Sequence, residues 1–184
     1  EEVGGHIPQV PDVTGVDICA VEPGRTLDGM LSDGALDAMI ALLPPPCFLR
    51  RVPGVERLFA DWRSAEKAYF RKTGVFPIMH TVGIRKTLLE RHSWLAHAVF
   101  QAFQEAKDAA IEELGILQAP KVTLPWAAAE LEETRRLMGE DFWPYGLAAN
   151  RKTLESLIRY SFEEGLSSRH LTVEELFTNE TLDT

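Results

Sequence analysis

His80 is the residue whose type and setting most directly suggest chemistry, because it ends the apolar segment 76–79. An imidazole exchanges its proton near neutral pH, so a histidine at the end of an apolar strand can act as a general acid. A lone histidine in such a segment is more often a hydrogen-bonded structural residue. From the residues alone, the structural interpretation of His80 is therefore the favoured one.

A second candidate is the turn that carries Arg25 and Thr26, between a predicted strand and a predicted helix. Helix N-termini present unpaired N–H groups and a partial positive charge, so they favour anions, and an arginine can add a two-point contact to a carboxylate. Such turns occur throughout α/β proteins. An ordinary capped turn with a solvent-facing Arg25 is the favoured alternative.

Arg63 and Glu66 lie three residues apart in a predicted helix, so their side chains share one face. Most pairs of this kind are surface salt bridges that contribute little to stability. His92 and His97 lack the spacing of the His-x-x-x-His zinc motif. The sequence also has no glycine-rich phosphate loop and no Gly-x-Ser-x-Gly elbow, so we predict no metal and no cofactor.

Three aromatic residues near proline turns, Trp126, Trp143 and Tyr145, could line an aromatic pocket. Large aromatic side chains in such positions more often pack in a core. Core packing is therefore the favoured interpretation for all three.

The composition is typical of a globular protein, with 184 residues, 45% hydrophobic and 26% charged. The formal net charge of −9, with basic residues scattered along the chain, argues against nucleic acid as a partner. No apolar run approaches the roughly 20 residues that span a bilayer, and no signal-like segment opens the sequence, so we expect no membrane insertion. The first residue is Glu1, which leaves an earlier export signal open. Cys19 and Cys47 are predicted to be free thiols, although a disulfide between them is left open.

Three segments have the composition of strands, residues 17–21, 36–43 and 76–84. A helix predicted to begin after Thr26 and to end at Gly34 separates the first two. Strand, helix and strand within about 30 residues form a βαβ unit. We therefore expect an α/β fold with mostly parallel sheets flanked by helices, becoming helix-rich toward the C-terminus.

Further helices are predicted from apolar spacing and from capping residues. They cover residues 55–70, 93–115, 125–138, 150–164 and 171–176.

Several stretches of the sequence can be compared with known families. They are EPGRTL (residues 22–27), GALDA (34–38), AEKAYFRKTGVFPIMHT (65–81) and AFQEAK (102–107), of which the third is the specific one. Together they resemble the 4,5-dihydroxyphthalate decarboxylase family. The resemblance implies a two-lobed fold of the type II periplasmic-binding-protein-like superfamily, with the ligand held between the lobes. Family members are longer, and this sequence is similar to their C-terminal half. Residues 1–60 are then expected to complete the second lobe, and residues 61–184 to return to the first lobe and add the C-terminal helices.

The resemblance implies non-oxidative loss of one carboxylate from 4,5-dihydroxyphthalate, giving 3,4-dihydroxybenzoate. Such a reaction needs an acid that protonates the ring carbon. That role is assigned to His80, with Arg25 and Thr26 gripping the retained carboxylate and Glu66 or Arg63 orienting a partner. Two neighbours of His80 complete the predicted substrate contacts, Met79 and Thr81.

The main alternative is a solute-binding protein that delivers a small anion or heterocycle to an ABC-type permease. Both interpretations need a small-molecule cleft with cationic groups. An enzyme is expected in the cytoplasm and a solute-binding protein in the periplasm, while homo-oligomerisation is left open. A folded module with no small-molecule site is the third, least favoured interpretation.

Overall fold

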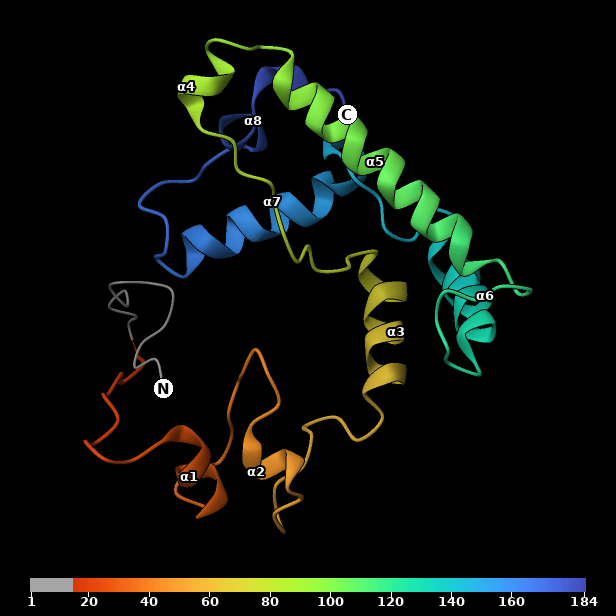
Figure 1. Cartoon of the computed structure of the whole chain (residues 1–184). Coiled ribbons are helices and arrows are strands. Elements are labelled where there is room, and N and C mark those ends of the chain that lie inside the picture. Colours follow the sequence, from red (N-terminus) through yellow and green to blue (C-terminus); the bar gives the residue numbers. More distant parts are fainter. Residues whose placement is uncertain (1–14) are drawn as a thin grey trace. The chain divides into compact units, whose positions relative to one another are not determined.

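The structure is a computed structural model that describes residues 15–184, and residues 1–14 lie outside the described part. All regular elements in the described part are helical (Figure 1). They are α1 (Leu27–Ser32), α2 (Pro46–Leu49), α3 (Trp62–Thr73), α4 (Lys86–Leu89), α5 (Leu95–Leu114), α6 (Ala127–Met138), α7 (Leu147–Glu163), α8 (Val173–Leu176) and the 3-10 helix η1 (Asn179–Thr181).

The predicted α/β fold with parallel sheets is wrong for residues 15–184, because no strand forms among them. The predicted strands at 17–21, 36–43 and 76–84 have no regular secondary structure. A strand exists only where its backbone N–H and C=O groups pair with a neighbouring strand, and none of these segments has such a ladder. The apolar residues that suggested a buried strand at 36–43 include Ile40, which is fully exposed. The sheets expected from a periplasmic-binding-protein-like architecture are likewise absent from residues 15–184, so that prediction is wrong for this part of the chain.

The helix predictions hold better. α5 ends at Gly115 and α6 ends at Gly139, as the capping residues predict. The reciprocal hydrogen bonds of a capping box between Thr172 and Glu175 open α8, which is also confirmed. α3 begins seven residues later than predicted, and α7 begins three residues earlier.

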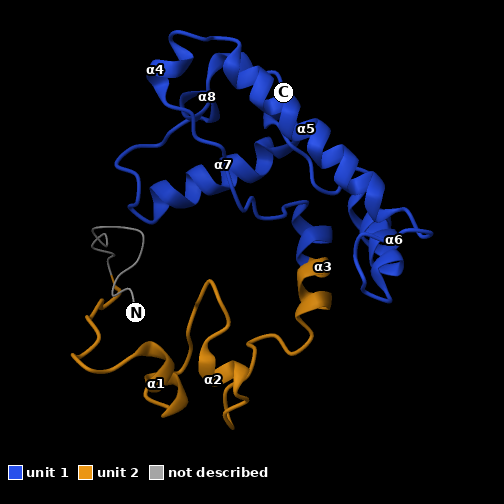
Figure 2. Ribbon diagram, viewed as in Figure 1, with its two compact units in different colours: residues 1–11, 69–184 blue, residues 12–68 orange. Residues whose placement is uncertain are grey.

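The described part of the chain divides into two compact units, which we call, in chain order, the first unit (residues 15–68, unit 2 in the key of Figure 2) and the second unit (residues 69–184, unit 1 in that key). Within the first unit, Asp28 of α1 accepts a hydrogen bond from the Cys47 N–H at 2.7 Å and one from Arg50 at 3.4 Å. Cys47 is fully buried and both cysteines are free thiols, as predicted. These hydrogen bonds to Asp28 link α1 to α2.

The second unit contains a core built on α7. Leu147, Leu154 and Ile158 of this helix pack with Val173 of α8. Four partly buried side chains close this core, Ile78, Leu171, Phe177 and Leu182. α5 contacts α4, α6 and η1, so the C-terminal segment is held between the two longest helices. No helix in residues 15–184 is long and apolar enough to cross a membrane.

Candidate active site: the His80 cavity

A cavity of about 750 Å³ lies within the second unit. Its walls come from segment 76–84, from α5, from the turn at 141–146, from α7 and from the C-terminal segment 176–184. Cavities of roughly 300 to 1,000 Å³ with mainly apolar walls are typical of small-molecule sites. The cavity is therefore large enough for an aromatic ring with several substituents.

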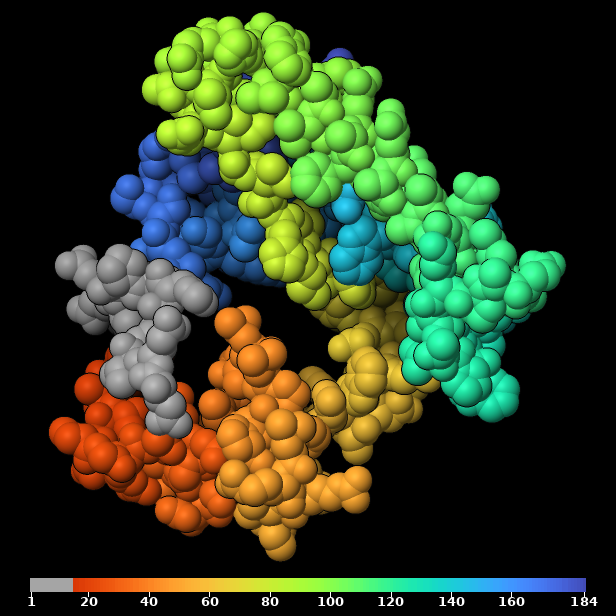
Figure 3. Space-filling model, in the orientation of Figure 1, coloured from red at the N-terminus to blue at the C-terminus, as the bar shows by residue number. Residues whose placement is uncertain are grey.

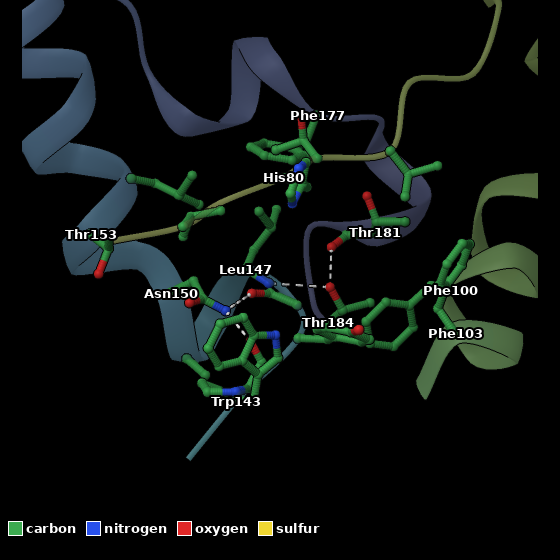
Figure 4. Close-up of a pocket in the computed structure, with 18 of the residues that line it drawn as sticks. His80, Phe100, Phe103, Trp143, Leu147, Asn150, Thr153, Phe177, Thr181 and Thr184 are labelled. Atoms are coloured by element: carbon green, nitrogen blue, oxygen red, sulfur yellow. Dashed lines mark hydrogen bonds between the residues drawn. The ribbon is translucent and has the colours of Figure 1, made fainter. Parts of the chain in front are cut away.

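Three predicted site residues line this cavity, Met79, His80 and Thr81. Their segment has no regular structure and connects α3 to α4. All three are exposed, and Figure 4 shows His80 beside Phe177 with its ring turned into the space between the walls. His80 is the histidine of the described lining. Its catalytic role stays a prediction, but its position gives an imidazole access to a bound ligand.

Aromatic side chains form much of the wall. The Phe76 and Trp143 rings meet edge to face, with centroids 5.6 Å apart. The visible face in Figure 3 likewise has yellow-green residues of the chain lying beside light-blue ones from much later in the sequence. Phe100 and Phe103 of α5 add two more rings (Figure 4). Such a wall favours a flat aromatic ligand, because edge-to-face and stacked ring contacts contribute binding free energy beyond that of the buried area alone.

Trp143 and Tyr145 thus line a pocket rather than a closed core, contrary to the favoured expectation. Trp126 follows neither interpretation, since it is 74% exposed and does not line the cavity.

One wall of the cavity is fixed by hydrogen bonds at the start of α7. The Asn150 amide donates to the carbonyls of Pro144 and Gly146, at 2.8 and 2.9 Å. The Thr184 carbonyl accepts from the Ala148 N–H at 2.7 Å, which caps the helix. Sequence reasoning missed Asn150, because it was interpreted as a helix-start residue and not as the brace of a turn.

The charged group of the wall is Asp141, which follows α6. Its Oδ1 lies 2.9 Å from the ammonium of Lys107, whose side chain is only 5% exposed. The same ammonium lies 5.2 Å from the centre of the Tyr145 ring. The sequence did not indicate the pair of Lys107 and Asp141. Lys107 is a charged residue in the second half of α5, where exposure is the usual expectation, and its partner is 34 residues away.

The other predicted site residues belong to the first unit. Thr26 is the N-cap of α1, and its hydroxyl oxygen accepts a hydrogen bond from the Gly29 N–H. Arg25 is exposed, and Arg63 and Glu66 are exposed side chains of α3. The roles proposed for these four residues remain predictions from sequence.

No group of three or more His, Cys, Asp or Glu side chains that could hold a metal ion occurs in the described part of the chain.

No protein-family model matches the chain. A curated protein named 4,5-dihydroxyphthalate decarboxylase, from Comamonas testosteroni, is 43% identical to it over 163 residues. The match covers 89% of this chain and 49% of that relative, so the chain spans about half the relative's length. The size and lining of the cavity are typical of a small-molecule binding site. The sequence match indicates which group of proteins the chain resembles. This identity bears out the resemblance to the 4,5-dihydroxyphthalate decarboxylase family over 89% of the chain.

Proposed function

We propose that this chain takes part in the non-oxidative decarboxylation of 4,5-dihydroxyphthalate, with the ring of the substrate bound in the His80 cavity. The observation that carries the proposal is the 43% identity to a protein of that name, in a chain whose cavity exposes one imidazole to an aromatic wall. Because the chain spans about half of the relative, the activity, the substrate and a cytoplasmic location are all part of the proposal.

The chemistry needs a proton donor and a ring that can accept the proton. His80 donates a proton to the ring carbon that carries the departing carboxylate. The hydroxyl para to that carbon supplies electron density, which stabilises the protonated ring. The bond to the carboxylate then breaks, its electron pair returns to the ring, and carbon dioxide leaves. One proton is consumed for each carbon dioxide released, and 3,4-dihydroxybenzoate is the product.

The walls support the other requirements of this reaction. The rings of Phe76, Trp143 and Phe103 hold a flat substrate and exclude water from one face. Met79 and Thr81 flank His80 in the lining and are proposed as substrate contacts. The described lining has no lysine or arginine. The grip on the retained carboxylate by Arg25 and Thr26, and the orienting role of Arg63 or Glu66, are proposed from the sequence alone.

The direct test is to incubate the protein with 4,5-dihydroxyphthalate and to follow carbon dioxide and 3,4-dihydroxybenzoate. The proposal predicts equal amounts of the two products, with no oxygen consumed. Tight binding of the diacid without either product would contradict it and would favour a binding protein.

A further inference from the structure

We infer that Asp141, held in place by Lys107, accepts a hydrogen bond from a ring hydroxyl of the ligand in the His80 cavity. This pair would make the cavity select a dihydroxylated phthalate over phthalate itself. The inference rests on the proposed function for the identity of the ligand, and it adds the group that distinguishes between ligands. In this role Asp141 is a substrate contact and Lys107 is a positioning residue.

The ammonium group of Lys107 is buried. An ammonium whose side chain is 5% exposed needs a counter-charge, because an unpaired buried charge is strongly unfavourable. Asp141 provides that charge at 2.9 Å, and Asp108 lies farther away at 3.6 Å. The face of the Tyr145 ring gives the ammonium a further contact. Lys107 is therefore fixed on three sides, and it fixes Asp141 in turn.

The Asp141 carboxylate has one oxygen that these contacts do not use. Its described contacts involve Oδ1, while a carboxylate has two oxygens and about four acceptor positions. The side chain is 55% exposed and lines the cavity, so a ligand can reach it. Asp141 is thus an oriented acceptor in the cavity lining, and its second oxygen has no described partner.

A hydroxyl is the kind of ligand group that suits such an acceptor. An ionised carboxylate accepts hydrogen bonds and repels other carboxylates, so it disfavours the acid groups of a phthalate and favours its hydroxyls. Asp141 is the one acidic residue of the described lining. An acceptor on the para hydroxyl would also raise electron density at the ring carbon that takes the proton.

The test compares the dissociation constants of phthalate and 4,5-dihydroxyphthalate by titration calorimetry. For the unaltered protein we expect at least about tenfold tighter binding of the dihydroxylated ligand, as for a hydrogen bond to a charged group. Asp141→Asn should remove most of that ratio and leave phthalate binding within about twofold. Lys107→Met should reduce the ratio similarly, and Lys107→Arg should restore part of it, which a purely structural role would not do.

Asp108→Asn is the matched control, since Asp108 contacts the same ammonium but does not line the cavity. It should keep the ratio. Equal affinity for the two ligands in the unaltered protein would overturn the inference even if every variant failed to fold. An unchanged ratio in a folded Asp141→Asn protein would overturn it as well.

The same experiment separates this inference from the proposed function. A hydroxyl preference that depends on Asp141, without formation of product, would contradict the decarboxylase and support the inference. Formation of product, with a ratio of dissociation constants that Asp141→Asn does not change, would support the decarboxylase and contradict the inference. If neither ligand binds, both are contradicted.

Discussion

At the scale of single residues, Gly146 is a position where the backbone leaves no room for a side chain. Its φ is +88°, and an added Cβ would lie 2.7 Å from the carbonyl carbon of Thr184. Gly146→Ala should therefore lower the free energy of unfolding by roughly 2 to 4 kcal/mol, from backbone strain plus the clash. Urea unfolding followed by tryptophan fluorescence measures the change.

Gly139→Ala is the control for this prediction. Gly139 has a similar φ of +97°, but an added Cβ would meet nothing within 4 Å. It should cost only the strain, about 1 to 2 kcal/mol. Equal losses in the two variants would show that the contact between the start of α7 and Thr184 does not matter.

The contacts of Asp28 should make the stability of the protein depend on pH. Hydrogen bonds from the Cys47 side chain and N–H, and then the charge of Arg50, hold the pKa of the Asp28 carboxyl below its ordinary value of 3.8. A depressed folded-state pKa contributes stability above the unfolded-state value, and that stability is lost as the pH falls through the folded-state value. Asp28→Asn should therefore be less stable than the unaltered protein at neutral pH. The difference should shrink below about pH 4, and a constant difference down to pH 2 would contradict this account.

At the scale of elements, the turn before α7 shapes one wall of the cavity. Because the Asn150 amide donates to two carbonyls, Asn150→Ala should cost roughly 1 to 3 kcal/mol of stability. Asn150→Asp should cost more, since a carboxylate would face two acceptors. Thermal unfolding gives the order of the two variants. The opposite order would mean that the side chain does not brace the turn.

The helices and the missing strands differ in how far local sequence determines them. The C-terminal ends of α5 and α6 were predictable because a helix end depends on a residue such as Gly115 or Gly139 within the last turn. A strand depends on a partner that can lie anywhere in the chain, so the apolar character of 36–43 could not establish one.

The candidate site shows the same contrast. His80, Met79 and Thr81 were identified because they are neighbours in one motif, and all three line the cavity. Asp141 and Asn150 were missed because their importance comes from contacts with Lys107 and Pro144 that only the folded chain creates.

At the scale of the whole molecule, the cavity and the main apolar core belong to one unit. The described lining runs from Phe70 to Thr184, and the core around Leu154 lies in the same stretch. The first unit has Cys47 as its one buried residue among those described. We therefore expect the proposed substrate ring to bind within residues 70–184, and substitutions there should alter ligand affinity most directly.

The central claim is that a substrate ring in this cavity is protonated by His80, and turnover by His80→Gln tests it most directly. Glutamine keeps hydrogen-bonding capacity but cannot supply the proton. We predict that 4,5-dihydroxyphthalate still binds within a few-fold of its original affinity, while 3,4-dihydroxybenzoate forms roughly 100-fold or more slowly. Full turnover in a folded His80→Gln protein would contradict the account.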